Sequence, residues 1–429
     1  MGDIFQEPIQ TPTVTAIEAV YKARGDAEER RRYLGGSAIG AECDRALWYS
    51  FRHCSEPEFP GRLYRLFQTG HLEEPRMVQD LRDIGVTVSE VDDDGEQYGV
   101  KALGGHFGGH MDGVGIGLPE AEKTWHVLEF KTHCRKSFEK LRKQGVEKSK
   151  LQHFVQCQIY MSLNGLTRAL YLAKCKDTDR LYSERISLDK AVAERYMDRA
   201  RYIIEATDPP PRVADKCTDF RCSFCDAKAL CWGLGDVAVP VPSISCRQCC
   251  HATPEIVEGS DEGLWTCRCG VPELEDGHPI PPEIQDKGCP NHLFIPGLVN
   301  GCEPIDGDDQ NIHYSEILDR ETHEFWQGPR PGAYPSVVLA AIPWALVSGD
   351  NLADNPHLRY PAGDCHIVWE GVAQDLADNW YNAYAIDIKD DKVIQSCSSE
   401  LAHVAEFDKG RLAFIDLATG MAEIREGKE

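Results

Sequence analysis

Two acidic residues and a lysine, Asp112, Glu129 and Lys131, have the types and the spacing of a hydrolytic metal site. Glu129 and Lys131 are two residues apart, so in a strand they share one face, while Leu128 and Phe130 face the other side and can be buried. Two converging carboxylates suit Mg²⁺ or Mn²⁺, and a lysine beside them can orient a metal-activated water and help to deprotonate it. This pattern predicts hydrolysis of a phosphodiester, although a solvated pair of strands would show the same spacing.

Two further groups of polar residues lie close to this motif in the sequence. His71 and Glu74 are three residues apart in a helical stretch and therefore lie on one face. An imidazole is an acceptable additional ligand for Mn²⁺, and an exposed helix surface is the alternative for both residues. Gln152, Gln156 and Tyr160 recur every four residues on the helix that follows the Glu129–Lys131 strand. This polar stripe points either to the site or to solvent.

The cysteine spacing completes an ordered set of motifs. Cys222-x2-Cys225-x5-Cys231 lies far downstream of Cys43. The order of cysteine, Gly-His, Asp, Glu-x-Lys, Gln-x3-Tyr and a three-cysteine cluster resembles the RecB-like iron–sulfur branch of the PD-(D/E)XK nuclease superfamily. CRISPR-associated adaptation exonucleases and the nuclease domains of break-processing helicases have this arrangement. The resemblance covers about residues 35–235, and Met111-Asp112 stands where the family pattern has Pro-Asp.

The resemblance implies a role for each matching position. The divalent metal would be held by His71, Asp112, Glu129 and the backbone carbonyl of Phe130. Lys131 would position or activate the attacking water. Gln156 and Tyr160 would support the lysine side of the site or contact the DNA backbone, whereas Glu74 has no secure counterpart. A [4Fe–4S] cluster would be ligated by Cys43, Cys222, Cys225 and Cys231, and it would join the start of the nuclease domain to its end.

Zinc is an alternative for these cysteines, because four thiolates also bind Zn²⁺ and spacing alone does not separate the two. Cys217 could replace Cys43 in a purely local site. The first residues have neither the basic start nor the apolar core of a secretory signal. Clustered cysteines in a cytoplasmic protein favour metal binding over disulfides, and the cytoplasm of a host is the expectation if the gene is viral.

A second set of metal-ligand residues follows a Val- and Pro-rich linker. Cys246-x2-Cys249 and Cys289-x2-His292 have the spacing of two zinc knuckles, and Cys267 or Cys269 could replace one of the four. A loop-rich segment with reduced cysteines is the alternative. The acidic surroundings favour a structural role or contact with a protein over DNA binding.

Charge is divided unevenly along the chain. The net charge of −24 comes mainly from the C-terminal part, since residues 1–235 carry 34 Lys and Arg against 36 Asp and Glu, and the remainder 12 against 34. The segment from Lys131 to Lys150 is locally basic and suits contacts to phosphates, unless it is only a solvated helix. The acidic remainder repels nucleic acid and favours a protein partner.

The periodicity predicts an α/β fold with a mixed sheet flanked by helices, and the resemblance implies that this fold is restriction-endonuclease-like. We expect a helix over residues 13–33, strands at 108–116 and 125–131, and a further strand at 336–346. Three regions follow: a nuclease domain with the iron–sulfur cluster over 1–235, a linker and zinc-ribbon-like module over 236–300, and an acidic α+β domain over 301–429.

Together these features predict a divalent-metal-dependent deoxyribonuclease, an exonuclease acting on single-stranded DNA ends. The alternative from another class is a non-catalytic DNA-binding or assembly factor that keeps the iron–sulfur fold. A compact nuclease with an accessory region would suit a phage or a bacterial DNA repair system. The chain has no Walker phosphate loop and no apolar run long enough to cross a membrane.

Overall fold

The computed structural model describes residues 11–234, 238–269, 279–289, 291–318, 321–330, 333–334 and 336–341, and the backbones of the strands between residues 358 and 426. The chain forms two compact units with interleaved segments. Unit 1 consists of Met1–Glu42, Pro57–Ile204 and Ile256–Gly263, and unit 2 consists of Cys43–Glu56, Glu205–Glu255 and Leu264–Glu429. The expected boundaries after residues 235 and 300 stay predictions, since the units follow a different division.

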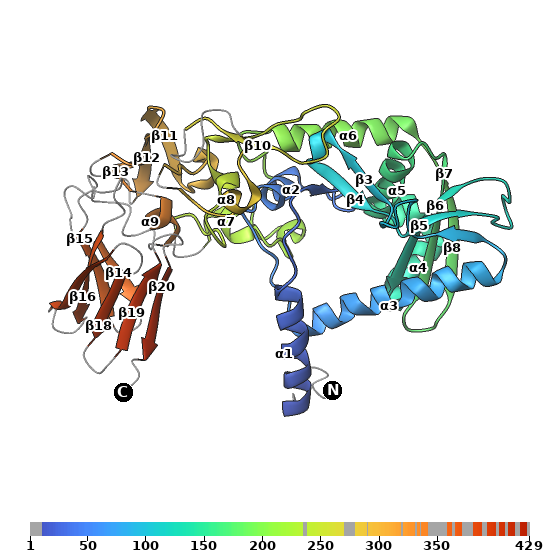
Figure 1. Ribbon diagram of the computed structural model, residues 1–429, viewed down its shortest axis with the longest axis horizontal. Helices are drawn as coiled ribbons and strands as arrows, with labels where there is room; N and C mark the ends of the chain where they lie inside the picture. Colours follow the sequence, from blue (N-terminus) through green and yellow to red (C-terminus); the bar gives the residue numbers. More distant parts are fainter. Residues whose placement is uncertain are drawn as a thin grey trace. The chain divides into compact units, whose positions relative to one another are not determined.

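Unit 1 is built on a five-stranded mixed sheet in the order β2-β5-β6-β7-β8. The strands β5 to β8 are labelled in Figure 1. The pair β6 and β7 is parallel, and the other neighbours are antiparallel. The helices of the unit are α1 (Pro12–Asp26), α3 (Gly61–Asp83), α4 (Arg135–Ser149), α5 (Leu151–Leu163) and α6 (Lys190–Glu205). The strands of this sheet are β2 (Thr87–Ser89), β5 (Gly113–Ile116), β6 (His126–His133), β7 (Arg168–Cys175) and β8 (Leu181–Ser187). The predicted α/β class is confirmed.

The alternation of side chains along β6 assigns different partners to the two faces of the sheet. Leu128 and Phe130 are buried in one cluster with Met77, Val78 and Leu81 of α3. Neighbouring strand residues point to opposite faces, so Glu129 and Lys131 lie on the face away from this cluster. The amide of Gln156, on α5, reaches Glu129 there. The sequence-based expectation for this strand is therefore confirmed.

A second, three-stranded sheet has the order β1-β4-β3. Its strands are β1 (Leu34–Gly35), β3 (Gly99–Ala102) and β4 (Phe107–His110). The single strand expected over residues 108–116 is wrong, because the chain leaves one sheet after His110 and enters the other at Gly113. The helix expected over residues 13–33 is shorter and ends at Asp26; at its start, Val14 N donates to the Thr11 side chain.

Unit 2 combines short helices with small antiparallel sheets. Its helices are α2 (Asp44–Phe51), α7 (Lys228–Trp232), α8 (Pro282–Gln285) and α9 (Ser336–Ala341). Its first strands are β9 (Ala252–Pro254), β10 (Trp265–Cys267), β11 (Cys302–Gly307), β12 (Ile312–Leu318) and β13 (Glu321–Gln327). The later ones are β14 (Leu358–Ala362), β15 (Cys365–Glu370), β16 (Tyr381–Asp387), β17 (Val393–Ser399), β18 (His403–Phe407), β19 (Arg411–Asp416) and β20 (Met421–Glu426). The strand expected at residues 336–346 is wrong where it can be compared, since residues 336–341 form α9.

Two buried arginines hold α2 within unit 2. The Arg247 guanidinium lies over the Trp265 ring at 4.9 Å and donates to the carbonyl of Phe51 at 3.0 Å. The Arg52 guanidinium lies over the rings of Trp48 and Trp265 and donates to the carbonyl of Ala206 at 3.1 Å. Burial lowers the pKa of Arg52 to about 10. Stacking on aromatic rings and bonds to carbonyls offset the cost of burying these charges.

None of the helices in the described ranges combines the length and the apolarity that crossing a membrane requires.

Shortening Leu128 tests the core between α3 and the sheet. Leu128 is 0% exposed, so Leu128→Ala removes buried methyl groups and leaves a cavity, at a cost of about 2–5 kcal/mol in the free energy of unfolding. Leu72→Ala on α3 is the control, because Leu72 is 70% exposed. This substitution should change the free energy of unfolding by less than about 0.5 kcal/mol. Urea denaturation measures both, and equal midpoints would contradict the described packing.

Candidate functional site

Asp112 lies where the chain passes from one sheet to the other. Gly113, next to it, has φ +145°, and a Cβ atom there would lie 2.7 Å from the carbonyl oxygen of Ser89. A glycine is therefore needed for β5 to begin this close to β2. The turn directs the Asp112 carboxylate towards β6, where its Oδ2 accepts a hydrogen bond from the backbone N–H of Phe130 at 2.6 Å.

Glu129 and Lys131 form the centre of the site. Glu129 is 0% exposed, and its Oε1 atom forms an ion pair with Lys131 Nζ. The same ammonium donates to the carbonyl of Phe130 at 3.1 Å. On the other side, Gln156 Nε2 donates to Glu129 Oε2 at 2.9 Å. The structure thus brings together Asp112, Glu129, Phe130, Lys131 and Gln156 as the sequence predicts.

Burial raises the pKa of each carboxyl group of the site, and neighbouring carboxylates add to the rise for Glu129 and Glu74. Burial raises the pKa of Glu129 to about 7; the charge of Lys131 opposes this rise, and those of Asp112 and Glu74 add to it. Burial likewise raises the pKa of Asp112, against the charge of Lys131. Burial alone would lower the pKa of Lys131, but Glu129 and Asp112 outweigh it, so the pKa is raised. Buried acidic groups that repel one another are typical of functional sites and are relieved by a cation.

His71 and Glu74 on α3 extend this acidic group. His71 Nδ1 lies 3.7 Å from Glu74 Oε1, and the side chain of His71 is 75% exposed. The pKa of Glu74 is raised by burial and then by the charge of Asp112. His71 counts among the groups that lower the pKa of Asp112. Both α3 residues are therefore electrostatic neighbours of the site. For Glu74, the sequence alone allowed either a metal ligand or a surface residue of the helix.

Tyr160 supports the site from within the protein. It is 1% exposed, and a hydrogen bond links its hydroxyl to Gln156. Burial raises its pKa. Of the two roles that the resemblance implies, support of the site agrees better with this burial than contact with DNA does. Gln152 instead donates to the carbonyl of Ser37 at 2.7 Å.

A histidine–tyrosine cluster beside the site was missed by the sequence analysis. His133 Nε2 lies 2.9 Å from the hydroxyl of Tyr171, and His153 Nδ1 lies 2.8 Å from the same oxygen. Burial lowers the pKa of His133 to about 4 and that of His153 to about 3, with Lys131 adding to both shifts. His133 continues the row of Glu129 and Lys131 on β6 at the same two-residue spacing. This two-residue spacing is the sequence feature that could have predicted His133 as a neighbour of the site.

The basic segment forms α4, directly after β6. It carries the exposed cations Arg135, Lys136, Lys140, Arg142, Lys143 and Lys148. Arg142 pairs with Glu139 at 3.4 Å. The buried residues of the helix are Phe138, Leu141 and Val146. The helix is thus amphipathic, with its cations directed to solvent. This arrangement agrees both with contacts to phosphates and with a merely solvated helix.

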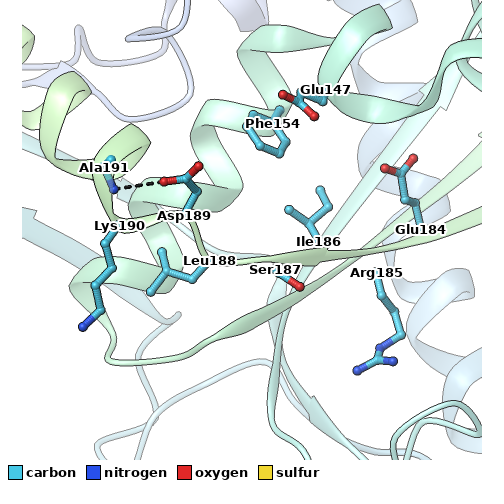
Figure 2. A pocket seen from close by; sticks show the side chains of 10 residues that line it. All are labelled: Glu147, Phe154, Glu184, Arg185, Ile186, Ser187, Leu188, Asp189, Lys190 and Ala191. Atoms are coloured by element: carbon cyan, nitrogen blue, oxygen red, sulfur yellow. Dashed lines mark hydrogen bonds between the residues drawn. The ribbon is translucent and has the colours of Figure 1, made fainter.

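A pocket of about 610 Å³ lies elsewhere in unit 1, between the end of β8 and the start of α6 (Figure 2). Figure 2 shows Ala191 N donating to Asp189 at 3.0 Å, a bond within the first turn of α6. Lining residues also include Phe154, Glu184 and Arg185. None of the residues predicted to be catalytic lines this pocket, so we do not assign the chemistry to it.

The first cysteine set lies entirely within unit 2. The pKa of Cys225 is raised by burial and then by the neighbouring thiols of Cys43 and Cys231. Ala46 N donates to Cys43 Sγ at 3.4 Å, and Cys222 is buried. The structure therefore brings the distant Cys43 close to two members of the local cluster. None of the described cysteines forms a disulfide.

The second cysteine set differs from the prediction in its histidine. Burial raises the pKa of Cys246, and the thiols of Cys249, Cys289 and Cys267 add to the rise. These four thiols are therefore neighbours. His292, in contrast, has Nδ1 2.8 Å from Ser336 Oγ and Nε2 3.0 Å from the carbonyl of Ser245. Since both ring nitrogens of His292 face protein oxygens, this arrangement leaves it no nitrogen for a metal.

No family model matches the chain, and no curated protein matches it. Among solved structures, an alkaline exonuclease from Laribacter hongkongensis matches 43% of this chain and 90% of its own, at 16% identity and a TM-score of 0.28. Its complex with dAMP matches the same shares at 15% identity and a TM-score of 0.30. A protein named SSO0001 matches 52% of this chain and 97% of its own, at 14% identity and a TM-score of 0.30. At these identities and TM-scores the similarities carry no conclusion about function.

The histidine cluster predicts how stability depends on pH. The pKa values of about 4 and about 3 for His133 and His153 lie below the value of about 6.5 in an unfolded chain. Their contribution is therefore fully present above pH 6.5 and is lost as the pH falls, because the unfolded chain takes up the protons first. His153→Gln should reduce the loss of unfolding free energy between pH 7 and pH 5 by roughly 1–2 kcal/mol.

Urea denaturation of the wild type and the variant at both pH values measures this difference. Glu129, whose pKa is raised, titrates in the opposite sense, but it is present in both proteins and cancels. His110→Gln is the control, because His110 is exposed on β4. An unchanged pH dependence in His153→Gln would contradict the described environment of this histidine.

Proposed function

We propose that unit 1 is a divalent-metal-dependent deoxyribonuclease that hydrolyses phosphodiester bonds. The observation that carries this proposal is the convergence of Asp112, Glu129 and Lys131 at the junction of β5 and β6, with Glu74 and His71 as charged neighbours. Buried carboxylates beside one lysine have the chemistry of a hard-cation site, and a solvated pair of strands would not bury Glu129.

The residues fit a divalent cation. Lys131 Nζ contacts both Glu129 Oε1 and the Phe130 carbonyl, so a positive charge is accommodated beside these two oxygens. Glu129 Oε1 is buried, and its charged partner is the ammonium of Lys131. We assign Mg²⁺ or Mn²⁺ to Asp112, Glu129 and the Phe130 carbonyl, with His71 as an additional ligand and Glu74 as a candidate for a second ion.

The residues around the cation would divide the work of hydrolysis. A bound divalent ion would act as a Lewis acid on the phosphodiester and lower the pKa of water. Lys131 would hold the attacking water and stabilise negative charge on the phosphate. Gln156 keeps the Glu129 carboxylate oriented through its 2.9 Å hydrogen bond, and Tyr160 positions Gln156.

The exposed cations of α4 suit the phosphates of a DNA strand, and such contacts would make binding salt-dependent. Action on the ends of single-stranded DNA is the finer part of the proposal. It is supported by the order of motifs that resembles the RecB-like exonucleases. We assign the acidic residues 301–429 to contact with a protein partner, because their charge repels nucleic acid.

We further propose two structural metal groups in unit 2. The closeness of Cys43 to Cys225 and Cys231 supports a [4Fe–4S] cluster on these thiols and Cys222. The mutual closeness of Cys246, Cys249, Cys267 and Cys289 supports tetrahedral Zn²⁺. Each group would join chain segments that are distant in sequence, which is the usual contribution of a structural metal to folding.

Replacing Lys131 tests the hydrolytic role. Lys131→Met should lower the rate of cleavage of end-labelled single-stranded DNA with Mn²⁺ by at least about 100-fold, since general acid–base and electrostatic groups contribute at this level. Lys101→Met on β3 is the control, because Lys101 is exposed. Circular dichroism checks that both variants fold.

Full activity of Lys131→Met would contradict the assignment of Lys131 to the hydrolytic site. A wild type that binds DNA but does not cut it with Mg²⁺ or Mn²⁺ would support the non-catalytic assembly factor instead.

Comparing Cys43 with Cys217 tests the cluster. After anaerobic purification, the wild type should be brown and contain iron and acid-labile sulfide. Cys43→Ser should lose most of both, because each thiolate ligand is needed to hold the cluster. Cys217→Ser should keep them. A colourless wild type with zinc in place of iron would contradict the iron–sulfur assignment without affecting the nuclease proposal.

A further inference from the structure

The chain folds three consecutive ligand-type side chains towards one point. Ala252 N donates to the carbonyl of Cys249 at 3.2 Å, which closes a turn over Cys249, Cys250 and His251. The two Sγ atoms and a ring nitrogen of His251 all lie within 4.8 Å of one another. In the described part of the chain, no other group of three His, Cys, Asp or Glu residues meets this distance. Consecutive residues of an extended strand would point to alternate sides, so the turn is what creates the group.

His251 has the features of a ligand that His292 lacks. The residue is 4% exposed, and its Nε2 atom is buried without a hydrogen-bond partner among the described residues. Leaving a buried nitrogen without a partner is unfavourable, so a partner that is not a protein group is expected there. The nitrogens of His292, as described above, face two protein oxygens.

Two backbone N–H groups are directed at the sulfur of Cys249. Its Sγ accepts a hydrogen bond from Leu293 N at 3.4 Å and another from the backbone N–H of His251. Cys250 N donates to the Leu293 carbonyl at 2.9 Å, which holds the turn against the neighbouring segment. A metal-bound thiolate would keep both N–H bonds, whereas burial raises the pKa of the metal-free Cys249 thiol.

The charged surroundings of the turn include both signs. Arg268 is an electrostatic neighbour of both Cys250 and His251. Cys269 is a further neighbour of Cys250, and Asp309 is a further neighbour of His251. Burial and then the charge of Arg268 lower the pKa of His251, and the charge of Asp309 opposes this. Cys269 supplies a further sulfur close to the group, as a fourth ligand requires.

We propose that Cys249, Cys250 and His251 bind a soft divalent ion of the Zn²⁺ type, with His251 rather than His292 as the imidazole ligand of the cysteine-rich module. Tetrahedral Zn²⁺ holds neighbouring sulfur ligands about 3.8 Å apart at Zn–S distances near 2.3 Å. The ligand atoms of the group all lie within 4.8 Å of one another, which is close to that spacing. The site is additional to the four-thiol group, with which it has Cys249 in common, and it does not depend on the nuclease activity of unit 1.

X-ray absorption at the zinc edge of the full-length, zinc-loaded wild type tests the proposal without any substitution. The expected result is a mixed nitrogen and sulfur shell with imidazole scattering. The His292→Ala variant should keep this scattering, because the nitrogens of His292 are bound to protein oxygens. A shell of sulfur alone in the wild type would overturn the proposal, and so would loss of the imidazole signal in His292→Ala.

Metal affinity gives a second readout. His251→Ala and Cys250→Ser should each weaken zinc binding at one site, measured by competition with a chromogenic chelator. The loss should exceed the roughly 10- to 100-fold that removal of a mere supporting partner causes. In the cobalt-substituted protein, both variants should shift the visible bands while His292→Ala leaves them unchanged. Wild-type affinity, stoichiometry and bands in both variants would overturn the assignment.

Discussion

A fully buried carboxylate is the constraint on which unit 1 depends. Glu129 lies in the middle of a central strand with 0% exposure, where an isolated charge would be strongly unfavourable. Its oxygens are instead matched by the ammonium of Lys131 and the amide of Gln156. The rest of the site follows from this need, because the strand that carries Glu129 must be held against both Asp112 and α5.

The two faces of the sheet divide the tasks of stability and chemistry. The α3 face contains the apolar cluster around Leu128 and Phe130, which supplies the stabilisation that permits polar burial on the other face. The row of Glu129, Lys131 and His133 points to that other face, together with Gln156 and His153 of α5. A rigid support of this kind keeps charged side chains close together although they repel one another.

The core of unit 2 combines apolar side chains with buried cations and thiols. Its buried apolar side chains come from short helices, strands and loops. Arginines stacked on Trp48 and Trp265 and clustered thiols lie among them. Residues 256–263 leave this module and join unit 1, where Gly263 N donates to the carbonyl of Gly104 at 2.9 Å. At Gly105, with φ +86°, a Cβ atom would lie 2.4 Å from the Asp261 carbonyl carbon, so this contact requires a glycine.

The sequence by itself determined the features that depend on the spacing of residues within one strand or helix. The two-residue period of a strand places Glu129 and Lys131 on one face whatever surrounds them, and the change from this period to a helical one marks the α/β class. Tertiary structure alone decided the contacts between distant segments. The inclusion of Glu74, the pairing of His133 and His153 through Tyr171, and the division of the chain at Cys43 belong to this group. The split of residues 108–116 between two sheets and the different surroundings of His251 and His292 belong to it as well. Such contacts depend on which segments pack together, and spacing along the chain contains no information about that choice.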